Sequence, residues 1–347
     1  MSSLPGRFAP MLASPTGTLP PALAGWTIEP KWDGIRVIVE VTARGARLWT
    51  RNGNDKAPQF PEIARALTAL AAQSGPMVLD GEIVALDAKG GVLRFQALQG
   101  RVHAERDETT SRLTARAHAA FVAFDLLADG NRVLTGLAWT ERRRALESRI
   151  PAKRSGVIRR GESVRCGTAA AKKLFERARE EQWEGVLLKR VDATYAAGRR
   201  TPDWRKVKLE REQEFVIGGY TAPTEGAARD HFGALLVGYF DDDGLRYAGK
   251  VGTGYTHPML ALLARRLAPL RRRTSPFLDA PRAGAASTTW VEPVLVAQVR
   301  YNEMTDAGIL RQPSFLGLRD DKDAAEVRLE ENGSAAGAIT SGLRCAS

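Results

Sequence analysis

Hydrophobic and polar positions alternate along several short stretches of this chain, which is the pattern of half-buried β-strands. The alternation is clearest at Ile35, Val37, Val39 and Val41. The turn residues 43–45 lead into a second stretch at 47–51, which predicts a hairpin that begins near Lys31. Three further strands are predicted at 77–86, 119–127 and 185–189.

Helical spacing separates these strands. Ile63, Leu67 and Leu70 follow Pro61, a residue favoured at the first helical position, and predict a helix over 60–72. Two more helices are predicted at 140–149 and 168–182. The first part of the chain is therefore expected to be a mixed α+β domain.

Beyond Lys208 the pattern changes to short strands separated by turns, with one helix among them. The strands are predicted at 214–221, 233–240, 245–251 and 290–300, and the helix at 256–270. This number of elements is typical of a small, partly open barrel such as an OB-fold. With a boundary placed near 209–212, we expect an α+β domain over 1–208 and a β-rich OB-fold domain over 209–330.

The two ends of the sequence carry no clear periodicity. Residues 1–25 contain five prolines among glycine, serine and alanine, and are predicted to be extended coil. Residues 331–347 are rich in glycine, serine and alanine and are predicted to be a disordered tail.

Charge narrows the class of protein. The 347 residues include 51 Lys and Arg against 40 Asp and Glu, a formal net charge of +11, with 44% hydrophobic residues. The chain has no uninterrupted apolar run of ~18 residues and no secretory signal at its start, so we expect a soluble cytoplasmic protein with no membrane association. The positive surplus favours a phosphate-rich partner, although an arginine-rich surface that binds no anion gives the same charge.

Cysteine and histidine usage excludes several kinds of site. The two cysteines, Cys166 and Cys345, are too few for a disulfide framework or a four-ligand zinc site. The four histidines form no metal-binding or triad pattern. Any catalysis is expected to use other groups.

Seven charged strings lie on or beside the apolar strands. The first, EPKWDGIR, covers residues 29–36, and the others are TRNG at 50–53, LDGEIV at 79–84, VAFDLL at 122–127, WEGVLLK at 183–189, WRKVK at 204–208 and RDDK at 319–322. Charges on such strands are costly to bury unless they meet a ligand, because an unpaired buried charge costs several kcal/mol. A shared polyanion and metal ion would satisfy them together.

In this order and at these separations, the strings resemble nucleotidyltransferase motifs I, Ia, III, IIIa, IV, V and VI of the ATP-dependent DNA ligases. The similarity runs from about Phe8 to Glu330. It is strongest toward the ligase module of the bacterial end-joining enzyme DNA ligase D, through EPKWDGIR, FVIGGYT, RYAGKVGTGY and RQPSFLGLRDDK. The resemblance implies an adenylation (nucleotidyltransferase) domain followed by an OB-fold domain.

The resemblance also implies a mechanism, in which Lys31 attacks the α-phosphate of ATP, releases pyrophosphate and carries AMP as a phosphoramidate. A free lysine titrates near ~10.4, so we expect the site to lower the pKa of Lys31 through Lys206, Lys208, desolvation and a divalent metal. The two lysines would then stabilise the charge on the transferring phosphate. Asp33 would orient the nucleophile or a metal-bound water.

The other motif positions are carried over by the same resemblance. Glu184 is the expected metal carboxylate, and Glu82 would contact the ribose or help to hold the metal, Mg²⁺ or Mn²⁺. Five residues are assigned to the nucleotide or to the 5′-phosphate of the nick, namely Glu29, Arg36, Arg51, Phe124 and Lys189. Taken singly, Phe124 is more often a core residue than a platform for a base, and each arginine is equally typical of a solvated strand face.

In the second domain, Arg319, Asp321 and Lys322 match the motif that closes over ATP and orients pyrophosphate; taken alone they read as a charged turn. Closure of this kind requires movement of the OB-fold domain, with residues 209–212 as the hinge. The later steps would transfer AMP to the 5′-phosphate of nicked duplex DNA and join the strand to the adjacent 3′-hydroxyl, with release of AMP.

Other readings share parts of this evidence. RNA ligases and capping enzymes also nucleotidylate a lysine, and they form the alternative among enzymes. NAD-dependent ligases typically carry a zinc finger, for which two cysteines do not suffice, so ATP is the expected donor. A silent OB-type nucleic-acid binder leaves Lys31, Glu82 and Glu184 unexplained. The resemblance suggests a stand-alone monomer that works in DNA repair with a Ku-like end-binding protein or a repair polymerase.

Overall fold

The computed structural model describes residues 8–16, 23–104, 112, 115, 117–150, 156–181, 183–209, 211–223, 232–280 and 288–330. It divides into two compact units after Leu209. The predicted tail at 331–347 and Cys345 lie outside the described residues. Within the described ranges, no helix is both long and apolar enough to cross a membrane.

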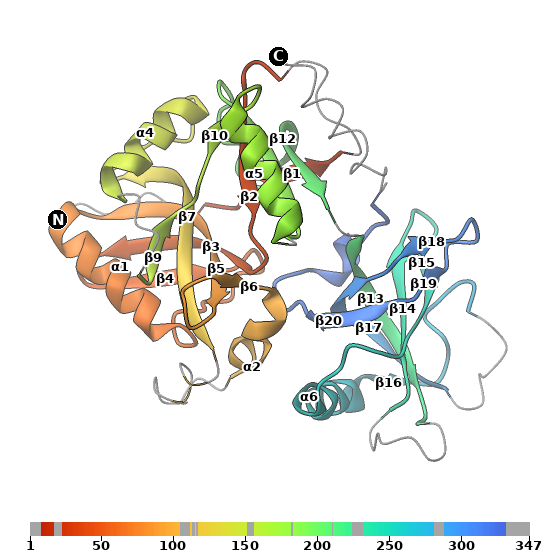
Figure 1. The fold of residues 1–347 in the computed structure, drawn as a ribbon. Coiled ribbons are helices and arrows are strands. Elements are labelled where there is room, and N and C mark those ends of the chain that lie inside the picture. The colour runs from red at the N-terminus through yellow and green to blue at the C-terminus, as the bar shows by residue number, and fades with distance from the viewer. Residues whose placement is uncertain are drawn as a thin grey trace. The chain divides into compact units, whose positions relative to one another are not determined.

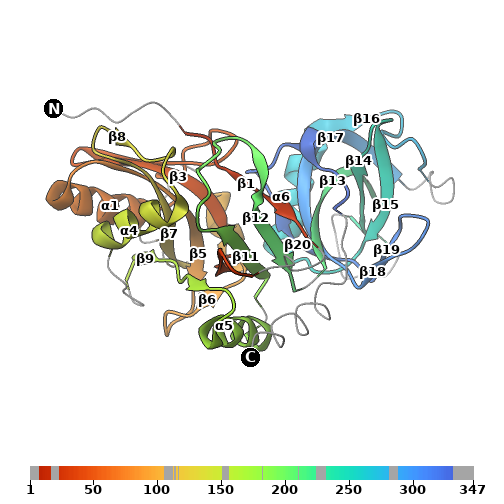
Figure 2. The ribbon, with the colours of Figure 1, turned by 90° about the horizontal axis from the view of Figure 1, so that it is seen from above.

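A seven-stranded sheet forms one half of the first unit (Figure 1). Its strands are β3 (Ile35–Thr42), β4 (Gly45–Trp49), β5 (Met77–Leu86), β6 (Val92–Leu93), β7 (His118–Asp129), β8 (Arg132–Val133) and β9 (Ile158–Arg160). The hairpin of β3 and β4 and the strand β5 confirm the strands that the alternation of the sequence predicts. Helices α1 (Pro61–Ser74) and α4 (Trp139–Arg149) cover one face, with Ile63, Leu67 and Leu146 in the shared core (Figure 2).

A five-stranded sheet forms the other half. In the order β1-β12-β11-β2-β10, its strands are β1 (Leu12–Pro15), β12 (Arg200–Lys208), β11 (Gly185–Arg190), β2 (Trp26–Lys31) and β10 (Val164–Arg165). Helix α5 (Ala169–Glu180) packs on β2 and β11 through Leu174 and Phe175. The unit also holds the short helices η1 (Phe95–Leu98) and α2 (Gln99–Val102).

One expectation is wrong here. The segment predicted as coil contains the edge strand β1, which pairs in parallel with β12. The strand before Lys31 does not pair with β3, because β2 belongs to the five-stranded sheet and β3 to the seven-stranded sheet. The chain therefore crosses from one sheet to the other directly after Lys31.

The second unit is a strongly bent antiparallel sheet with one helix. Its strands are β13 (Glu212–Thr221), β14 (Leu235–Phe240), β15 (Leu245–Val251), β16 (Arg271–Arg272), β17 (Thr288–Arg300) and β20 (Ser314–Leu318), and β18 (Glu303–Met304) pairs with β19 (Leu310–Arg311). Helix α6 (His257–Leu267) continues into η2 (Ala268–Leu270), and η4 (Ala324–Glu326) follows β20. Leu260 and Leu263 of α6 join the core of the sheet.

Candidate active site

Lys31 is the last residue of β2, at the point where the chain leaves the five-stranded sheet. In the register of that sheet, Lys31 lies opposite Gly185 of β11, and Gly185 lies opposite Lys208 of β12. Glu184 immediately precedes this row, and its carboxylate forms an ion pair with Lys31 Nζ. Three separate motif strings therefore meet at one lysine.

Two glycines in these strings lie where the backbone of a neighbouring strand approaches too closely for a side chain. A Cβ on Gly34 would lie 2.1 Å from the carbonyl oxygen of Ile83, and one on Gly185 would lie 2.1 Å from that of Val207. Neither distance is compatible with a side chain. The glycine that follows Asp33 and the one that follows Glu184 thus allow the strands to approach closely enough to place the neighbouring carboxylates.

The electrostatic environment of Lys31 differs from the expectation. Burial alone would lower the pKa of Lys31, and Lys208 acts in the same direction. The charge of Glu184 and its hydrogen bond, with a contribution from Glu82, outweigh both and raise the pKa above 10.5. Desolvation and Lys208 therefore act on Lys31 in the expected direction, whereas the overall direction is set by Glu184 and is the reverse of the expected one.

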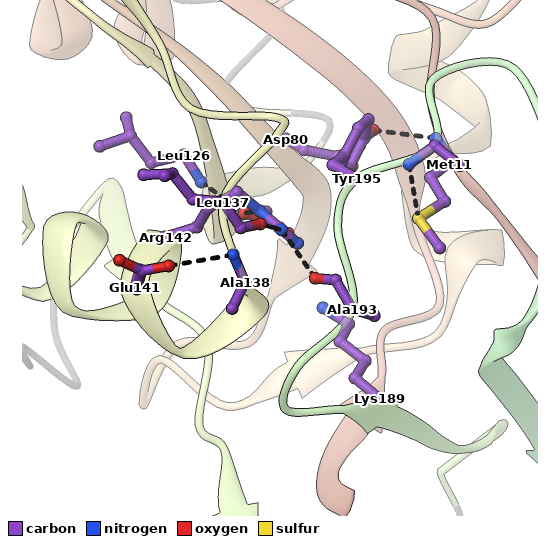
Figure 3. A network of polar contacts seen from close by, with 12 residues as sticks. Met11, Asp80, Leu126, Leu137, Ala138, Glu141, Arg142, Lys189, Ala193 and Tyr195 are labelled. Carbon is purple, nitrogen blue, oxygen red and sulfur yellow. Dashed lines mark hydrogen bonds and ion pairs between the residues drawn. The ribbon is translucent and has the colours of Figure 1, made fainter.

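Arg36 and Glu82 lie opposite each other on β3 and β5. Arg36 donates to both oxygens of Asp80, at 3.0 and 2.6 Å. The hydroxyl of Tyr195 donates to Asp80 at 2.7 Å and accepts from the backbone N–H of Met11 at 2.9 Å (Figure 3). Asp80 is fully buried, so this network holds the guanidinium of Arg36 in place from inside the protein.

Phe124, Lys189 and Glu29 form a buried cluster. Lys189 Nζ lies 2.7 Å from Glu29 Oε2, and it lies over the rings of Phe124 and Trp204 at 4.5 and 4.2 Å from their centroids. Glu29 Oε1 is buried and has no hydrogen-bond partner. Phe124 is 4% exposed and also packs in the core with Trp204.

The remaining residues assigned to the first unit have different surroundings. Asp33 accepts a hydrogen bond from the backbone N–H of Phe95 at 3.0 Å, and so ties the loop after β2 to η1. Lys206 lies opposite Leu187 in the sheet, two residues before Lys208 on the same strand. Arg51 lies half-buried in the turn after β4.

In the second unit, the predicted closing motif is a small ionic network. Arg319 donates to both oxygens of Asp321, at 2.9 and 2.8 Å, and Lys322 Nζ lies 3.2 Å from Glu214. Burial alone would raise the pKa of Asp321, but the charges of Arg319 and Lys322 outweigh it and lower the pKa. These residues belong to a different unit from Lys31.

The structure thus brings together Lys31, Glu184 and Lys208 directly and places Glu82 within electrostatic reach. Sequence reasoning gave no role to Asp80 and Tyr195. Asp80 stands inside the quoted LDGEIV string, but Tyr195 belongs to none of the strings. Asp125 of VAFDLL has a structural role, because it forms a buried bidentate pair with Arg142, which also donates to Ala193 O (Figure 3).

Candidate metal ligands are few. Among the described residues, no group of three or more His, Cys, Asp or Glu side chains is arranged to hold a metal ion. Mg²⁺ usually binds through one or two carboxylates together with substrate phosphates. Glu184 and Glu82, which both act on Lys31, fit that mode of binding.

Two family models match the chain. Residues 10–208 match the ATP dependent DNA ligase domain, and residues 228–322 match the ATP dependent DNA ligase C terminal region. The first match ends at Lys208, one residue before the division between the two units.

Curated relatives agree with this assignment. The chain is 40% identical over 323 residues to the multifunctional non-homologous end joining protein LigD of Mycobacterium bovis. This match covers 92% of the chain but only 40% of that relative. It is 34% identical to DNA ligase C1 of Mycolicibacterium smegmatis, with 93% of this chain and 92% of the relative covered.

A solved structure supports the fold. The mycobacterial DNA ligase D complexed with ATP and MES matches at a TM-score of 0.64 and 38% identity, over 93% of this chain and 98% of that one. The expected fold class, a nucleotidyltransferase domain followed by an OB-fold domain, is confirmed. On these grounds, the chain belongs to the family of ATP-dependent DNA ligases.

Proposed function

We propose that this chain seals nicks in duplex DNA through a lysyl-AMP intermediate on Lys31. The observation that carries the proposal is the ion pair of Lys31 with Glu184, in a row with Lys208 across three strands. A nucleophilic amine, a carboxylate and a second cation are the groups that nucleotidyl transfer from a triphosphate requires.

In the first step, the Nζ of Lys31 forms a bond to the α-phosphorus of ATP as the bond to pyrophosphate breaks. The nucleophile must first lose the proton that Glu184 now stabilises. A divalent cation at Glu184 and Glu82 would supply charge neutralisation at the phosphates. Lys206 and Lys208 stabilise the negative charge that develops on the transferring phosphate.

The nucleotide would be oriented by the buried residues of the first unit. Glu29 Oε1, which has no hydrogen-bond partner, suits a donor such as the exocyclic amine of adenine. Phe124 and Lys189 line the same cluster, and Arg36, fixed by Asp80, would bind the ribose or a phosphate. Arg51 would contact the 5′-phosphate of the nick. Asp33 would orient the nucleophile or a metal-bound water. Arg319 and Lys322 would orient pyrophosphate.

In the second step, the phosphoramidate bond breaks as AMP passes to the 5′-phosphate of the nick. In the third, the 3′-hydroxyl attacks that phosphate, closes the backbone and releases AMP. Both steps require a phosphate-rich substrate, which is consistent with the net charge of +11.

The test uses α-labelled ATP with Mg²⁺ or Mn²⁺, followed by a chase with nicked DNA or nicked RNA. Wild type and the control Lys172→Ala, a change at an exposed position of α5, should take up label and discharge it to nicked DNA with sealing. Lys31→Ala should take up none. Discharge to RNA alone would favour an RNA ligase, and absence of label from protein that is free of AMP by intact mass would exclude the mechanism.

We further propose that the chain acts in end joining, because curated relatives carry end joining in their names. We also propose that it works as a monomer. Joining of linear DNA should increase when a Ku-like end-binding protein or a repair polymerase is added. Light scattering should give a mass near 37.8 kDa. Equal joining with and without both added proteins would argue against the partner proposal while leaving nick sealing intact.

A further inference from the structure

A cavity of about 600 Å³ lies in the first unit, outside the residues assigned to catalysis. Its walls come from the turn between β5 and β6, from β7, α4 and the segment between β9 and β10, and from the end of α5. None of the residues assigned above to ATP, metal or phosphate lines it. The volume is in the range of small-ligand pockets.

One wall is cationic and incompletely hydrogen-bonded. Arg143 is 8% exposed; its Nε donates to Glu147 at 2.9 Å and its Nη2 to Gly161 O at 2.8 Å, while Nη1 has no hydrogen-bond partner. Ser163 Oγ, on the same wall, is also buried without a partner. Buried unsatisfied groups cost about 1–3 kcal/mol each, so these two groups beside one cavity are positions that water or a polar ligand would satisfy.

Further positive charge faces the same cavity. Arg159, Arg160, Arg177 and Lys89 all line it. The guanidinium of Arg177 pairs with Glu162 at 2.5 Å, whereas Arg160 Nη2 lies 4.0 Å from Glu147 Oε1. Five cations stand against three carboxylates, those of Glu147, Glu162 and Glu181, so the cavity favours an anion.

Two tryptophans also line the cavity. Trp32 and Trp183 lie with their ring centroids 6.3 Å apart, tilted by 33°. The guanidinium of Arg177 lies over the ring of Trp183, 5.0 Å from its centroid. Indole faces of this kind bind planar bases, and stacking of one base contributes about 1–3 kcal/mol.

From the unsatisfied Arg143 and Ser163 and the two tryptophans that line the same cavity, we infer that this cavity binds a nucleoside 5′-phosphate. The phosphate would complete the hydrogen bonding of Arg143 Nη1 and Ser163 Oγ, and the base would pack against Trp32 or Trp183. Trp32 follows Lys31 and Trp183 precedes Glu184, so a bound nucleotide would lie beside the strand ends that carry these two residues. The ligand is either a free nucleotide or the phosphorylated terminal nucleotide of a DNA strand.

The inference is tested by the binding of thymidine monophosphate to the full chain. Binding is measured by tryptophan fluorescence and by calorimetry. Arg143→Lys keeps the charge but removes the unpartnered nitrogen, and should weaken binding at least tenfold. Ser163→Ala, which removes a hydroxyl that bonds to nothing, should fold normally and weaken binding about threefold or more. Arg165→Lys and Ser148→Ala, at positions that do not line the cavity, should bind within about twofold of wild type.

Two oligothymidines, one with a 5′-phosphate and one with a 5′-hydroxyl, distinguish the sources. Tighter binding of the phosphorylated strand than of thymidine monophosphate, sensitive to Ser163→Ala, identifies a strand end. Equal or weaker binding of the strand identifies a free nucleotide. Absence of binding by both phosphorylated probes up to roughly 10 mM, or binding that the cavity variants leave unchanged, would overturn the inference.

A final arm separates this cavity from the ATP site. Protein with AMP already attached to Lys31, verified by intact mass, should bind thymidine monophosphate as unmodified protein does. Loss of binding on adenylylation would place the cavity within the ATP site and overturn the inference. Failure to adenylylate would instead count against the proposed function, since the measurements on unmodified protein need no AMP on Lys31.

Discussion

Single residues in this protein are constrained chiefly by how closely backbones approach and by which charges face them. The sequence predicted Lys31 as the nucleophile and Glu184 as the metal carboxylate, because both residues and their neighbours match nucleotidyltransferase motifs. It did not predict that the pKa of Lys31 would be raised, because the sign depends on one contact. Two oppositely directed effects, burial and the Glu184 charge, act on the amine of Lys31, and only the folded structure shows which is larger.

Gly185→Ala tests the close approach of β11 and β12. The added Cβ would meet the carbonyl oxygen of Val207 at 2.1 Å, so the strands must separate and Glu184 must shift. We expect a loss of about 1–3 kcal/mol in the free energy of unfolding in urea, the usual cost of overpacking, and at least a tenfold slower uptake of AMP. Gly136→Ala is the control, since a Cβ there meets nothing within 4 Å. Equal stability of both variants would contradict this account.

Cys166 offers a test of local burial through its pKa. Burial raises the pKa of this thiol from 9.0 to about 12. Alkylation requires the thiolate, whose fraction at pH 8 would then be lower by roughly a factor of 10³ than for an ordinary thiol. In a Cys345→Ser background, iodoacetamide should label Cys166 slowly at pH 8 and faster with each unit of pH. Rapid labelling of the native protein, at the rate measured in urea, would show that the thiol is exposed.

Elements followed the sequence pattern where strands alternate and helices carry an apolar stripe. Strand β5 has the predicted bounds, and α1 lies within two residues of the prediction at each end. The pattern could not show that β2 and β3 pair in different sheets, because alternation sets which face is buried and not which strand is the neighbour. Strand β1 was missed since it ends in a proline, which an edge strand accommodates.

The pairing of β2 with β11 buries the ion pair of Glu29 with Lys189, and Lys189→Met tests its contribution. Both side chains are almost fully buried, so removal of the lysine leaves an uncompensated carboxylate. We expect a loss of about 3–5 kcal/mol in the free energy of unfolding. The double variant Glu29→Leu, Lys189→Met should recover a large part of that loss, because no buried charge remains. If the single and double variants unfold at the same urea concentration, the pair is not the source of the effect.

At the scale of the whole molecule, the chain consists of two units with separate cores. Every hydrophobic cluster of the described residues lies either before residue 210 or after it. The change in strand pattern near residue 209 predicts a boundary that coincides with this division. The hydrophobic pattern does not predict how the units act together in the reaction; the role of Arg319 and Lys322 in closing over ATP is implied by the family resemblance and stays a prediction.

Division of the chain at residue 210 into two separately produced pieces tests that relation. Since each core is complete within its unit, both pieces should fold and unfold cooperatively when followed by circular dichroism. If Arg319 and Lys322 orient pyrophosphate, residues 1–209 alone should form lysyl-AMP at least a hundredfold more slowly than the whole chain, and adding residues 210–330 should partly restore the rate. In the intact chain, Arg319→Ala should slow the same step, whereas Arg311→Ala, at an exposed position of β19, should not. Undiminished adenylation by the first piece would assign the entire first step to the unit that contains Lys31, and would leave Arg319 and Lys322 a structural role, through contacts that include those to Asp321 and Glu214.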